Sequence, residues 1–174
     1  LQGVECEVLS DGALDLPDEA LAACDLVQAS VHTSLSQPRE RITARALAAM
    51  ANPNIHILGH PSGRQINQRE PADYDWEALF AAAASARVAL EINASPERLD
   101  LNDTHARRAM ELGCLLTIST DAHSPAMFRN IEFGLLTARR AWVTPERVVN
   151  TWPLKKVLDW ARLRRSTPTH SPNV

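Results

Sequence analysis

The chain has 174 residues, of which 45% are hydrophobic and 22% charged, so its composition is that of a single globular domain. Its net charge of −3 disfavours tight autonomous binding to a polyanion, and no apolar run reaches the roughly 18 residues of a membrane helix. No signal-peptide pattern opens the chain, and its three cysteines lack the CxxC spacing of a zinc site. We therefore expect free thiols, a cytoplasmic location and no membrane partner.

Strand-like and helix-like segments alternate through most of the chain. Five apolar, β-rich runs are expected to form strands, at residues 4–9, 26–31, 55–59, 88–92 and 114–119. Helix-like segments lie between them, at residues 18–24, 38–51, 74–87 and 103–112. The second has Ser36 as a candidate cap, and Gly113 closes the fourth. Because parallel neighbours need crossover connections, this order predicts a parallel sheet, either doubly wound or part of a barrel.

After the fifth strand only helices are expected, at residues 131–140, at 144–150 with Thr144 as cap, and at 153–164. The predicted domain covers residues 1–165, and residues 166–174 are expected to be a disordered tail. Because a strand begins almost at residue 1, we expect the chain to be a piece of a longer protein. The basic segment at 139–165 is interpreted as a solvated helix face.

Titratable or amide side chains lie at or near the ends of all five predicted strands. They are Glu5, His32, His60, Glu91 with Asn93, and Asp121 with His123. The carboxyl ends of parallel strands lie on one side of a sheet, so these groups are expected to lie together in one pocket at that side, called the mouth below. Mixed imidazole and carboxylate donors suit Zn²⁺, Mn²⁺ or Fe²⁺, and such metals promote hydrolysis of phosphate esters.

Taken one at a time, these residues have plainer interpretations. A single histidine at a strand end is more often structural than a metal ligand, and Asp121 could cap a turn. Glu91, between two apolar residues, is interpreted as a buried carboxylate that binds backbone groups. Arg64 in "HPSGR" is a candidate phosphate-binding residue, with a surface salt bridge as an equal alternative.

The other three histidines are not assigned to the site. His56 is interpreted as a structural residue deep in its strand, and His105 and His170 as residues that face solvent.

Five segments resemble one family. In chain order they are "GVECEVLSDGALDLPDE", "ASVH", "GHPSGR", "LEINASPERLDLND" and "STDAHS". Together they are similar to the PHP (polymerase and histidinol phosphatase) domain of bacterial family X DNA polymerases, over residues 3–161. The resemblance implies a distorted (β/α)₇ barrel of parallel strands and a metal-dependent 3′-5′ exonuclease of DNA repair.

The resemblance also implies roles for residues of this chain. Glu5 would bridge two metals, His32 and His60 would complete one of them, and Asp121 and His123 would serve a second and a third. The metals would be Mn²⁺ or Zn²⁺, up to three in the intact domain. Catalytic roles would fall to Glu5, Asp121 and Arg64, whereas Glu91 and Asn93 would be wall residues. Implied partners are DNA 3′ ends and an N-terminal polymerase region of the same full-length chain.

The chain departs from the family at its beginning. The family starts with an HxH motif on its first strand, and no such motif occurs here. The expected fold is therefore a partial PHP barrel that lacks its first strands, with five remaining ligands, uncovered apolar surface and weak or no activity in isolation. Two alternatives stay open at this point: a histidinol-phosphatase-like enzyme for small molecules, and a degenerate structural domain.

Overall fold

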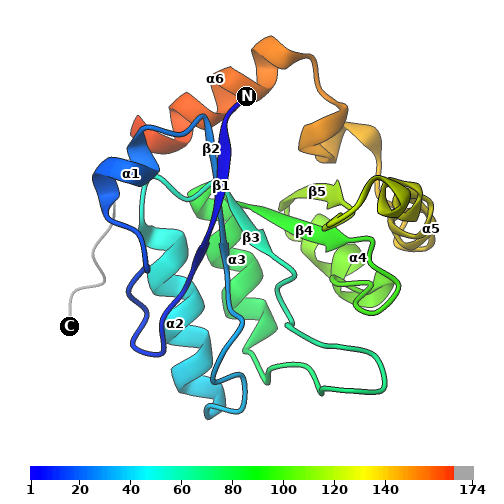
Figure 1. Cartoon of the computed structure of the whole chain (residues 1–174), viewed down its shortest axis with the longest axis horizontal. Helices are drawn as coiled ribbons and strands as arrows, with labels where there is room; N and C mark the ends of the chain where they lie inside the picture. Colours follow the sequence, from blue (N-terminus) through cyan, green and yellow to red (C-terminus); the bar gives the residue numbers. More distant parts are fainter. Residues whose placement is uncertain (167–174) are drawn as a thin grey trace.

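The structure, a computed structural model that describes residues 1–166, contains a five-stranded parallel sheet whose strands follow in chain order (Figure 1). The strands are β1 (Gly3–Glu7), β2 (Leu26–Ser30), β3 (Ile57–Gly59), β4 (Ala89–Asn93) and β5 (Leu115–Ser119). All five predicted strands are confirmed, with ends within two residues of those expected. A doubly wound sheet reverses its strand order, so this sequential order favours the partial barrel.

Helices connect the strands and follow the last one. They are α1 (Asp18–Ala22), α2 (Arg39–Ala51), α3 (Trp76–Ala86), α4 (Asp103–Glu111), α5 (Ile131–Arg140) and α6 (Leu154–Ser166), with 3₁₀ helices η1 (Pro125–Asn130), η2 (Pro145–Arg147) and η3 (Val149–Thr151). Side chains cap two of them: Asp75 accepts from Ala78 N before α3, and Asn102 accepts from His105 N before α4. Gly113 follows α4 with a positive φ of 87°, as expected for a closing glycine.

Three boundary predictions need correction. Ser36 does not cap α2, because Pro38 occupies the position before the first helical residue. The predicted helix at 144–150 is two 3₁₀ turns, since Val148 between them has an extended backbone. The predicted tail begins one residue too early, because Ser166 belongs to α6; the rest of it, residues 167–174 with His170, lies outside the described residues.

The two faces of the sheet differ in polarity because successive side chains of a strand point to opposite sides. One face carries buried apolar residues such as Cys6, Val27, Leu58 and Leu90, which pack in one core with residues of α2, α3 and α4. The register places polar residues on the other face. Glu5 is paired with Gln28, and Ser30 is paired with Gly59.

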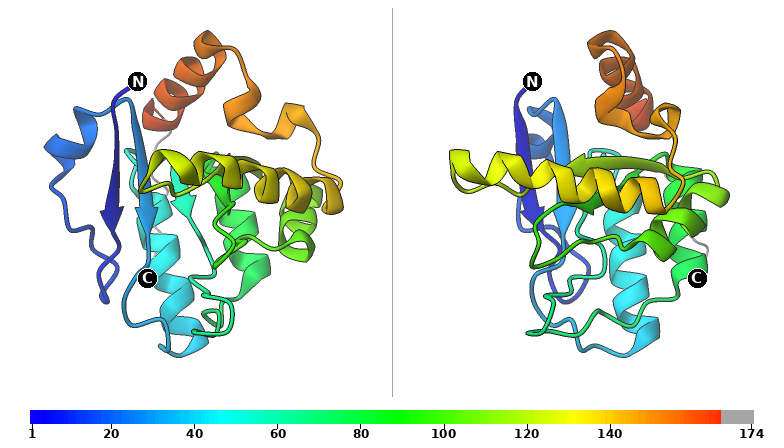
Figure 2. Two further views of the ribbon diagram at one scale, coloured as in Figure 1. Left: turned by 45° about the vertical axis from the view of Figure 1, so that its right-hand side comes forward. Right: turned by 90° about the vertical axis from the view of Figure 1, so that its right-hand side faces the viewer.

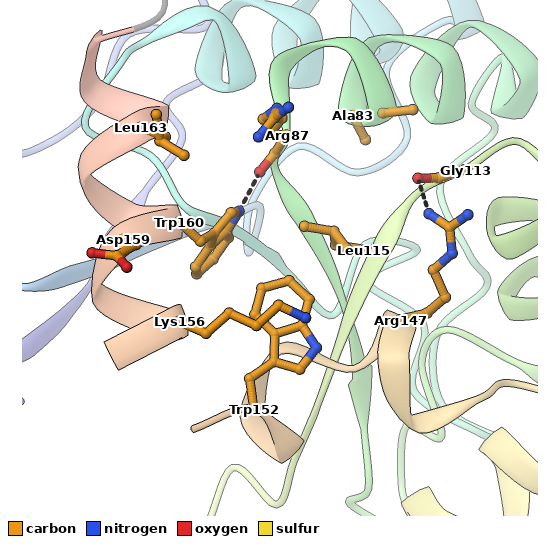
Figure 3. Close-up of a pocket in the computed structure, with 11 residues that line it drawn as sticks. Ala83, Arg87, Gly113, Leu115, Arg147, Trp152, Lys156, Asp159, Trp160 and Leu163 are labelled. Atoms are coloured by element: carbon orange, nitrogen blue, oxygen red, sulfur yellow. Dashed lines mark hydrogen bonds between the residues drawn. The ribbon is translucent and has the colours of Figure 1, made fainter. Parts of the chain in front are cut away.

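Helix α6 closes the amino-terminal end of the polar face (Figures 1 and 2). The opening residues of β2 to β5 are Leu26, Ile57, Ala89 and Leu115, and they form a second apolar cluster with α6 and η3. Trp160 of α6 is buried there, and its Nε1 donates to the carbonyl oxygen of Arg87 at 2.9 Å (Figure 3). Because α6 covers the amino-terminal end of the polar face, the carboxyl-terminal end is the one at which the predicted ligands can be reached.

A hollow of about 420 Å³ lies between α6, the end of α3 and the beginning of β5 (Figure 3). Its walls include Arg147, which donates to the Gly113 carbonyl at 3.1 Å, and Trp152, whose ring centre lies 3.7 Å from the Lys156 ammonium. The lining includes none of the predicted metal ligands. This hollow is therefore separate from the candidate site.

Helix α5 approaches the ends of β4 and β5 through a glycine. A Cβ atom on Gly134 would lie 2.6 Å from Ile118 Cγ2 and 2.9 Å from Ala94 Cβ, so only glycine permits this packing distance. Large apolar side chains remain exposed on and before α5, among them Phe128 and Leu136. The expectation of uncovered apolar surface is met at this helix.

All three cysteines are free, as expected, with Cys24 only partly buried. Burial raises the pKa of the Cys6 and Cys114 thiols to about 11, so both stay protonated at neutral pH. In the part of the chain that the structure describes, none of the helices combines the length and the apolar character that a bilayer crossing requires.

Candidate metal centre

Three of the predicted ligands meet at the carboxyl end of the polar face. Glu5 lies within β1, His32 lies just beyond β2, and His60 directly follows β3. The Nε2 atoms of His32 and His60 lie 3.8 and 3.4 Å from Glu5 Oε1. One donor atom from each of the three residues fits within 4.8 Å of the others. The parallel topology thus gathers donors from three crossover units at one point.

Two residues of β2 hold the Glu5 carboxylate in place. Ser30 Oγ donates to Glu5 Oε1 at 2.5 Å, and Gln28 Nε2 donates to the same oxygen at 3.2 Å. The hydrogen bond with His60 is the largest cause that lowers the pKa of Glu5 to about 2; Ser30 and Gln28 add to it, and burial opposes it. Glu5 is therefore an ionised carboxylate at neutral pH, which is the form that binds a cation.

Glu91 of β4 fixes the backbone beside His60. The carboxylate is buried and accepts from His60 N at 2.5 Å and from the Ser119 hydroxyl. Burial raises the pKa of Glu91 despite these bonds. His60 itself has a positive φ of 25°, an uncommon conformation for a residue with a side chain. The interpretation of Glu91 as a buried carboxylate bonded to backbone is confirmed.

The donor set fits a borderline divalent ion. Zn²⁺ binds imidazole nitrogen and carboxylate oxygen at about 2.0–2.2 Å in a tetrahedron, so its ligand atoms lie about 3.4 Å apart. The separations of 3.4 and 3.8 Å between the imidazole nitrogens and Glu5 Oε1 are close to that distance, and all three donors lie within 4.8 Å of one another. Three protein donors leave a position for water or substrate. The residues present therefore fit one catalytic-type metal.

Asp121 and His123 lie at the rim rather than in this group. The His123 side chain is 79% exposed, and its Nδ1 lies 2.8 Å from the Asp121 carbonyl oxygen. The Asp121 carboxylate instead accepts from Asn93 Nδ2 at 3.2 Å and lies 3.6 Å from Arg98 Nε. Within residues 1–166, the three-donor group contains neither Asp121 nor His123. Their roles as ligands stay predictions.

Hydrogen bonds nevertheless connect Asp121 with the three-donor group of Glu5, His32 and His60, called the triad below. Asn93 Nδ2 lies 3.4 Å from Glu91 Oε2, and that same oxygen accepts from His60 N. Because Asn93 also donates to Asp121, a chain of four residues runs from the triad to the rim. Asn93 is fully buried, as expected of a wall residue.

Arg64 binds backbone carbonyls. Its Nε donates to Arg98 O at 2.7 Å and its Nη2 to Leu99 O at 2.5 Å, so the salt-bridge alternative is wrong within the described chain. Asp100 adds to this link by accepting from Ser62 N and Gly63 N. Arg64 therefore ties the loop after β3 to the loop after β4, and phosphate binding by its guanidinium stays a prediction.

His56 and His105, the two other histidines among residues 1–166, have structural surroundings. His56 is fully buried, and the interpretation of a structural residue is confirmed. His105, expected to face solvent, is half-buried: its ring centre lies 4.1 Å from that of Trp76, and burial lowers its pKa. The sequence could not show this, because the contact depends on how α4 packs beside α3.

Several supporting residues were absent from the predicted site. They are Glu7, Gln28, Ser30, Arg98 and Ser119. Two of them could have been found from strand alternation. Gln28 and Ser30 are polar residues at every second position of an apolar run, which places both on the polar face with Glu5. Arg98 offers no such signal, because it reaches Asp121 from a loop.

Gly59 gives the supporting residues their space. A Cβ atom there would lie closer to Ser30 Oγ and Gln28 Nε2 than real Cβ atoms come. Gly59→Ala is expected to displace both side chains from Glu5, to lower stability by about 1 kcal/mol and to weaken metal binding roughly tenfold. Denaturant titration and calorimetric titration with Zn²⁺ measure these effects. Gly3→Ala is the control, because its Cβ would lie 3.4 Å from Leu26 O; equal metal affinities in both variants would contradict the prediction.

No family model matches the chain. It is 41% identical over 157 residues to the DNA polymerase/3′-5′ exonuclease PolX of Bacillus subtilis, across 90% of this chain and 28% of that protein. It is 31% identical over 161 residues to a probable phosphatase of Thermoanaerobacter sp., across 87% and 63% of the two chains. A probable phosphatase of Syntrophotalea carbinolica is 30% identical over 168 residues, across 91% and 67%.

The α/β fold and the Glu5, His32 and His60 group, together with these relatives, support a phosphoesterase. The chain belongs to the PHP family, and the resemblance found in its sequence motifs is confirmed. It spans less than two thirds of the length of the first two of these relatives.

Proposed function

We propose that this chain is a metal-dependent phosphoesterase unit and, in the protein that carries it, a 3′-5′ exonuclease that processes DNA ends in repair. The convergence of Glu5, His32 and His60 on one point is the observation that carries the proposal. The name of the Bacillus subtilis relative supports the exonuclease assignment, because 90% of this chain aligns with it. DNA 3′ ends and a polymerase region of the same protein are the proposed partners.

In this proposal Glu5, His32 and His60 hold Mn²⁺ or Zn²⁺. When bound, the metal supplies polarisation of a phosphate oxygen and a lowered pKa of a coordinated water. Ser30 and Gln28 keep the Glu5 carboxylate oriented. Glu91 holds the backbone of His60, and the His60 side chain is buried, so this imidazole has little freedom to leave the centre.

The rim residues have proposed roles as well. Asp121 and His123 are proposed as ligands of further metals, up to three in an intact domain. Asp121 and Arg64, together with Glu5, are proposed to act on the substrate. The carboxylate of Asp121 is partly exposed, so it is accessible to a ligand at the mouth.

The experiment measures release of nucleotides from a 3′-labelled primer on a template. The isolated chain and the longer protein that contains it are compared in Mn²⁺, with chelator added to a parallel sample. We expect metal-dependent release by the longer protein, loss of it in Glu5→Gln, and weaker release by the isolated chain. Release that chelator does not affect, or no release by the longer protein, would overturn the exonuclease proposal.

A second candidate is hydrolysis of a small phosphomonoester. It is favoured by the names of two relatives, both probable phosphatases, of which this chain covers 63% and 67%. The same ligands serve both reactions, so the centre does not distinguish them. Metal-dependent hydrolysis of p-nitrophenyl phosphate or histidinol phosphate, without action on primed DNA, would select this candidate.

A further inference from the structure

Glu7 makes a close contact with one of the three donors. It lies two residues after Glu5 in β1 and therefore points to the same face of the sheet. Its Oε2 lies 2.5 Å from His32 Nδ1, while its Oε1 accepts from His32 N at 3.1 Å and from Thr33 Oγ1 at 3.2 Å. One carboxylate thus contacts both the ring and the backbone of His32.

The Glu7 carboxylate is itself held by a buried arginine. Arg45 of α2 is 2% exposed, and its Nη2 lies 3.5 Å from Glu7 Oε1. The same guanidinium donates to the carbonyl oxygens of Val8 and Thr33, so it has little freedom to move. A glutamate beside a guanidinium is an ionised acceptor at neutral pH, since the ordinary pKa of its carboxyl is about 4.3.

This contact decides which nitrogen of His32 carries the proton. A neutral imidazole has one N–H donor and one acceptor nitrogen, and a carboxylate accepts but does not donate. With Glu7 at Nδ1, the proton belongs on Nδ1 and the lone pair on Nε2, the nitrogen that faces Glu5. Carboxylate partners of this kind orient metal-binding histidines and raise their basicity.

His60 provides an internal contrast. Its Nδ1 is buried, and within residues 1–166 it has no hydrogen-bond partner. The two imidazoles therefore differ in how they are fixed: His32 through its ring nitrogen by Glu7, and His60 through its backbone by Glu91. A carboxylate at Nδ1 is specific to His32 in this pair, because the His60 ring meets a carboxylate through Nε2, at Glu5.

We propose that Glu7 is a positioning residue that holds His32 in its Nδ1–H tautomer and thereby presents Nε2 to a divalent cation. The metal part of this inference rests on the proposed function. The tautomer part concerns the metal-free protein alone. Two separate measurements therefore test the two parts.

The first measurement is long-range ¹H–¹⁵N NMR of the metal-free chain at about pH 8, above the ordinary imidazole pKa of about 6.5. His32 of the unmodified protein is expected to show a protonated Nδ1 and an unprotonated Nε2. Glu7→Ala is expected to shift the ring towards the Nε2–H tautomer, and Glu7→Gln, which keeps an acceptor oxygen, to fall between the two. An Nε2–H ring in the unmodified protein overturns the proposal without any variant.

The second measurement is calorimetric titration with Co²⁺ as a spectroscopic substitute for the native ion. Glu7→Ala is expected to weaken Co²⁺ binding by roughly 10- to 100-fold, and Glu7→Gln by less. Asp73→Asn is the matched control, because Asp73 is an exposed carboxylate paired with Arg39 and is expected to leave affinity unchanged. Equal Co²⁺ affinity in Glu7→Ala and the unmodified chain overturns the proposal.

The two failures are distinguishable. If the unmodified chain binds no Co²⁺ but His32 shows the expected tautomer, the proposed function fails and the Glu7 assignment stands. If Co²⁺ binds and the tautomer does not respond to Glu7→Ala, the positioning role fails and the metal centre stands. Should Glu7→Ala not fold, the unmodified protein and Glu7→Gln still decide the tautomer.

Discussion

Glu5→Gln is expected to abolish useful metal binding by this chain. The substitution keeps the size of the side chain and an oxygen that can accept from Ser30, but it removes the negative charge next to both imidazoles. Loss of a supporting residue around a metal typically costs roughly 10- to 100-fold in affinity, so loss of a direct ligand should cost at least roughly 100-fold. Calorimetric titration with Zn²⁺ or Mn²⁺ measures the change.

The control for this prediction is Glu40→Gln, which removes one exposed carboxylate from the first turn of α2 and leaves the mouth untouched. It should bind metal as the unmodified chain does. A thermal shift upon metal addition gives an independent readout, because a ligand of the folded state raises stability by mass action. If Glu5→Gln retained full affinity and the same thermal shift, the centre assigned to Glu5, His32 and His60 would be wrong.

The centre depends on one feature of the fold, the parallel arrangement of strands in chain order. Each strand of such a sheet ends on the same side, so side chains from residues 5, 32 and 60 meet without any local motif linking them. The amino-terminal end of the same face is filled by α6, with Trp160 buried against the strand beginnings. The polar face is therefore closed at one end and available to ligands at the other.

Much of this arrangement follows from sequence pattern. Apolar runs separated by helical segments are enough to place His32 and His60 just beyond their strands, because strand ends are marked by a change in composition. Alternation along β1 places Glu5 and Glu7 on one face. The apolar neighbours of Glu91 indicate a buried strand. The structure agrees, because β4 lies between β3 and β5 and all five of its residues are buried.

The features that the sequence did not predict, the contacts of Arg64 and the outward orientation of His123, lie in loops. Arg64 meets the carbonyls of Arg98 and Leu99 because two loops from different crossover units lie together, and no periodicity encodes that distance. His123 is turned outwards by the local backbone, with Asp121 at a positive φ of 51°. Such conformations depend on packing around the loop, so a DxH spacing alone does not fix where its side chains point.

A buried histidine away from the mouth is expected to make stability depend on pH. His56 Nδ1 accepts from Val27 N at 3.1 Å, and its Nε2 lies 3.3 Å from the carbonyl oxygen of Ala161 in α6. This pattern requires the neutral ring, because a proton on Nδ1 would face the Val27 N–H. Burial lowers the pKa of His56 from 6.5 to about 4, with nearby Arg165 and Arg164 adding to the effect and the bond to Ala161 opposing it.

The sign of the pH effect follows from where the proton binds. Between pH 6.5 and about 4 the unfolded chain takes up a proton at residue 56 that the folded chain excludes, so acidification favours unfolding. The contribution of His56 is complete above pH 6.5 and is lost as the pH falls to about 4, a change of about 3 kcal/mol in the free energy of unfolding.

Denaturant titrations at a series of pH values measure this change in the unmodified chain and in His56→Gln. The glutamine amide can accept and donate at the same site but does not titrate, so carboxylates elsewhere affect both proteins equally and the difference isolates His56. We expect His56→Gln to lose about 3 kcal/mol less than the unmodified chain across this interval. Parallel pH profiles for the two proteins would show that the His56 ring does not oppose protonation in the folded state.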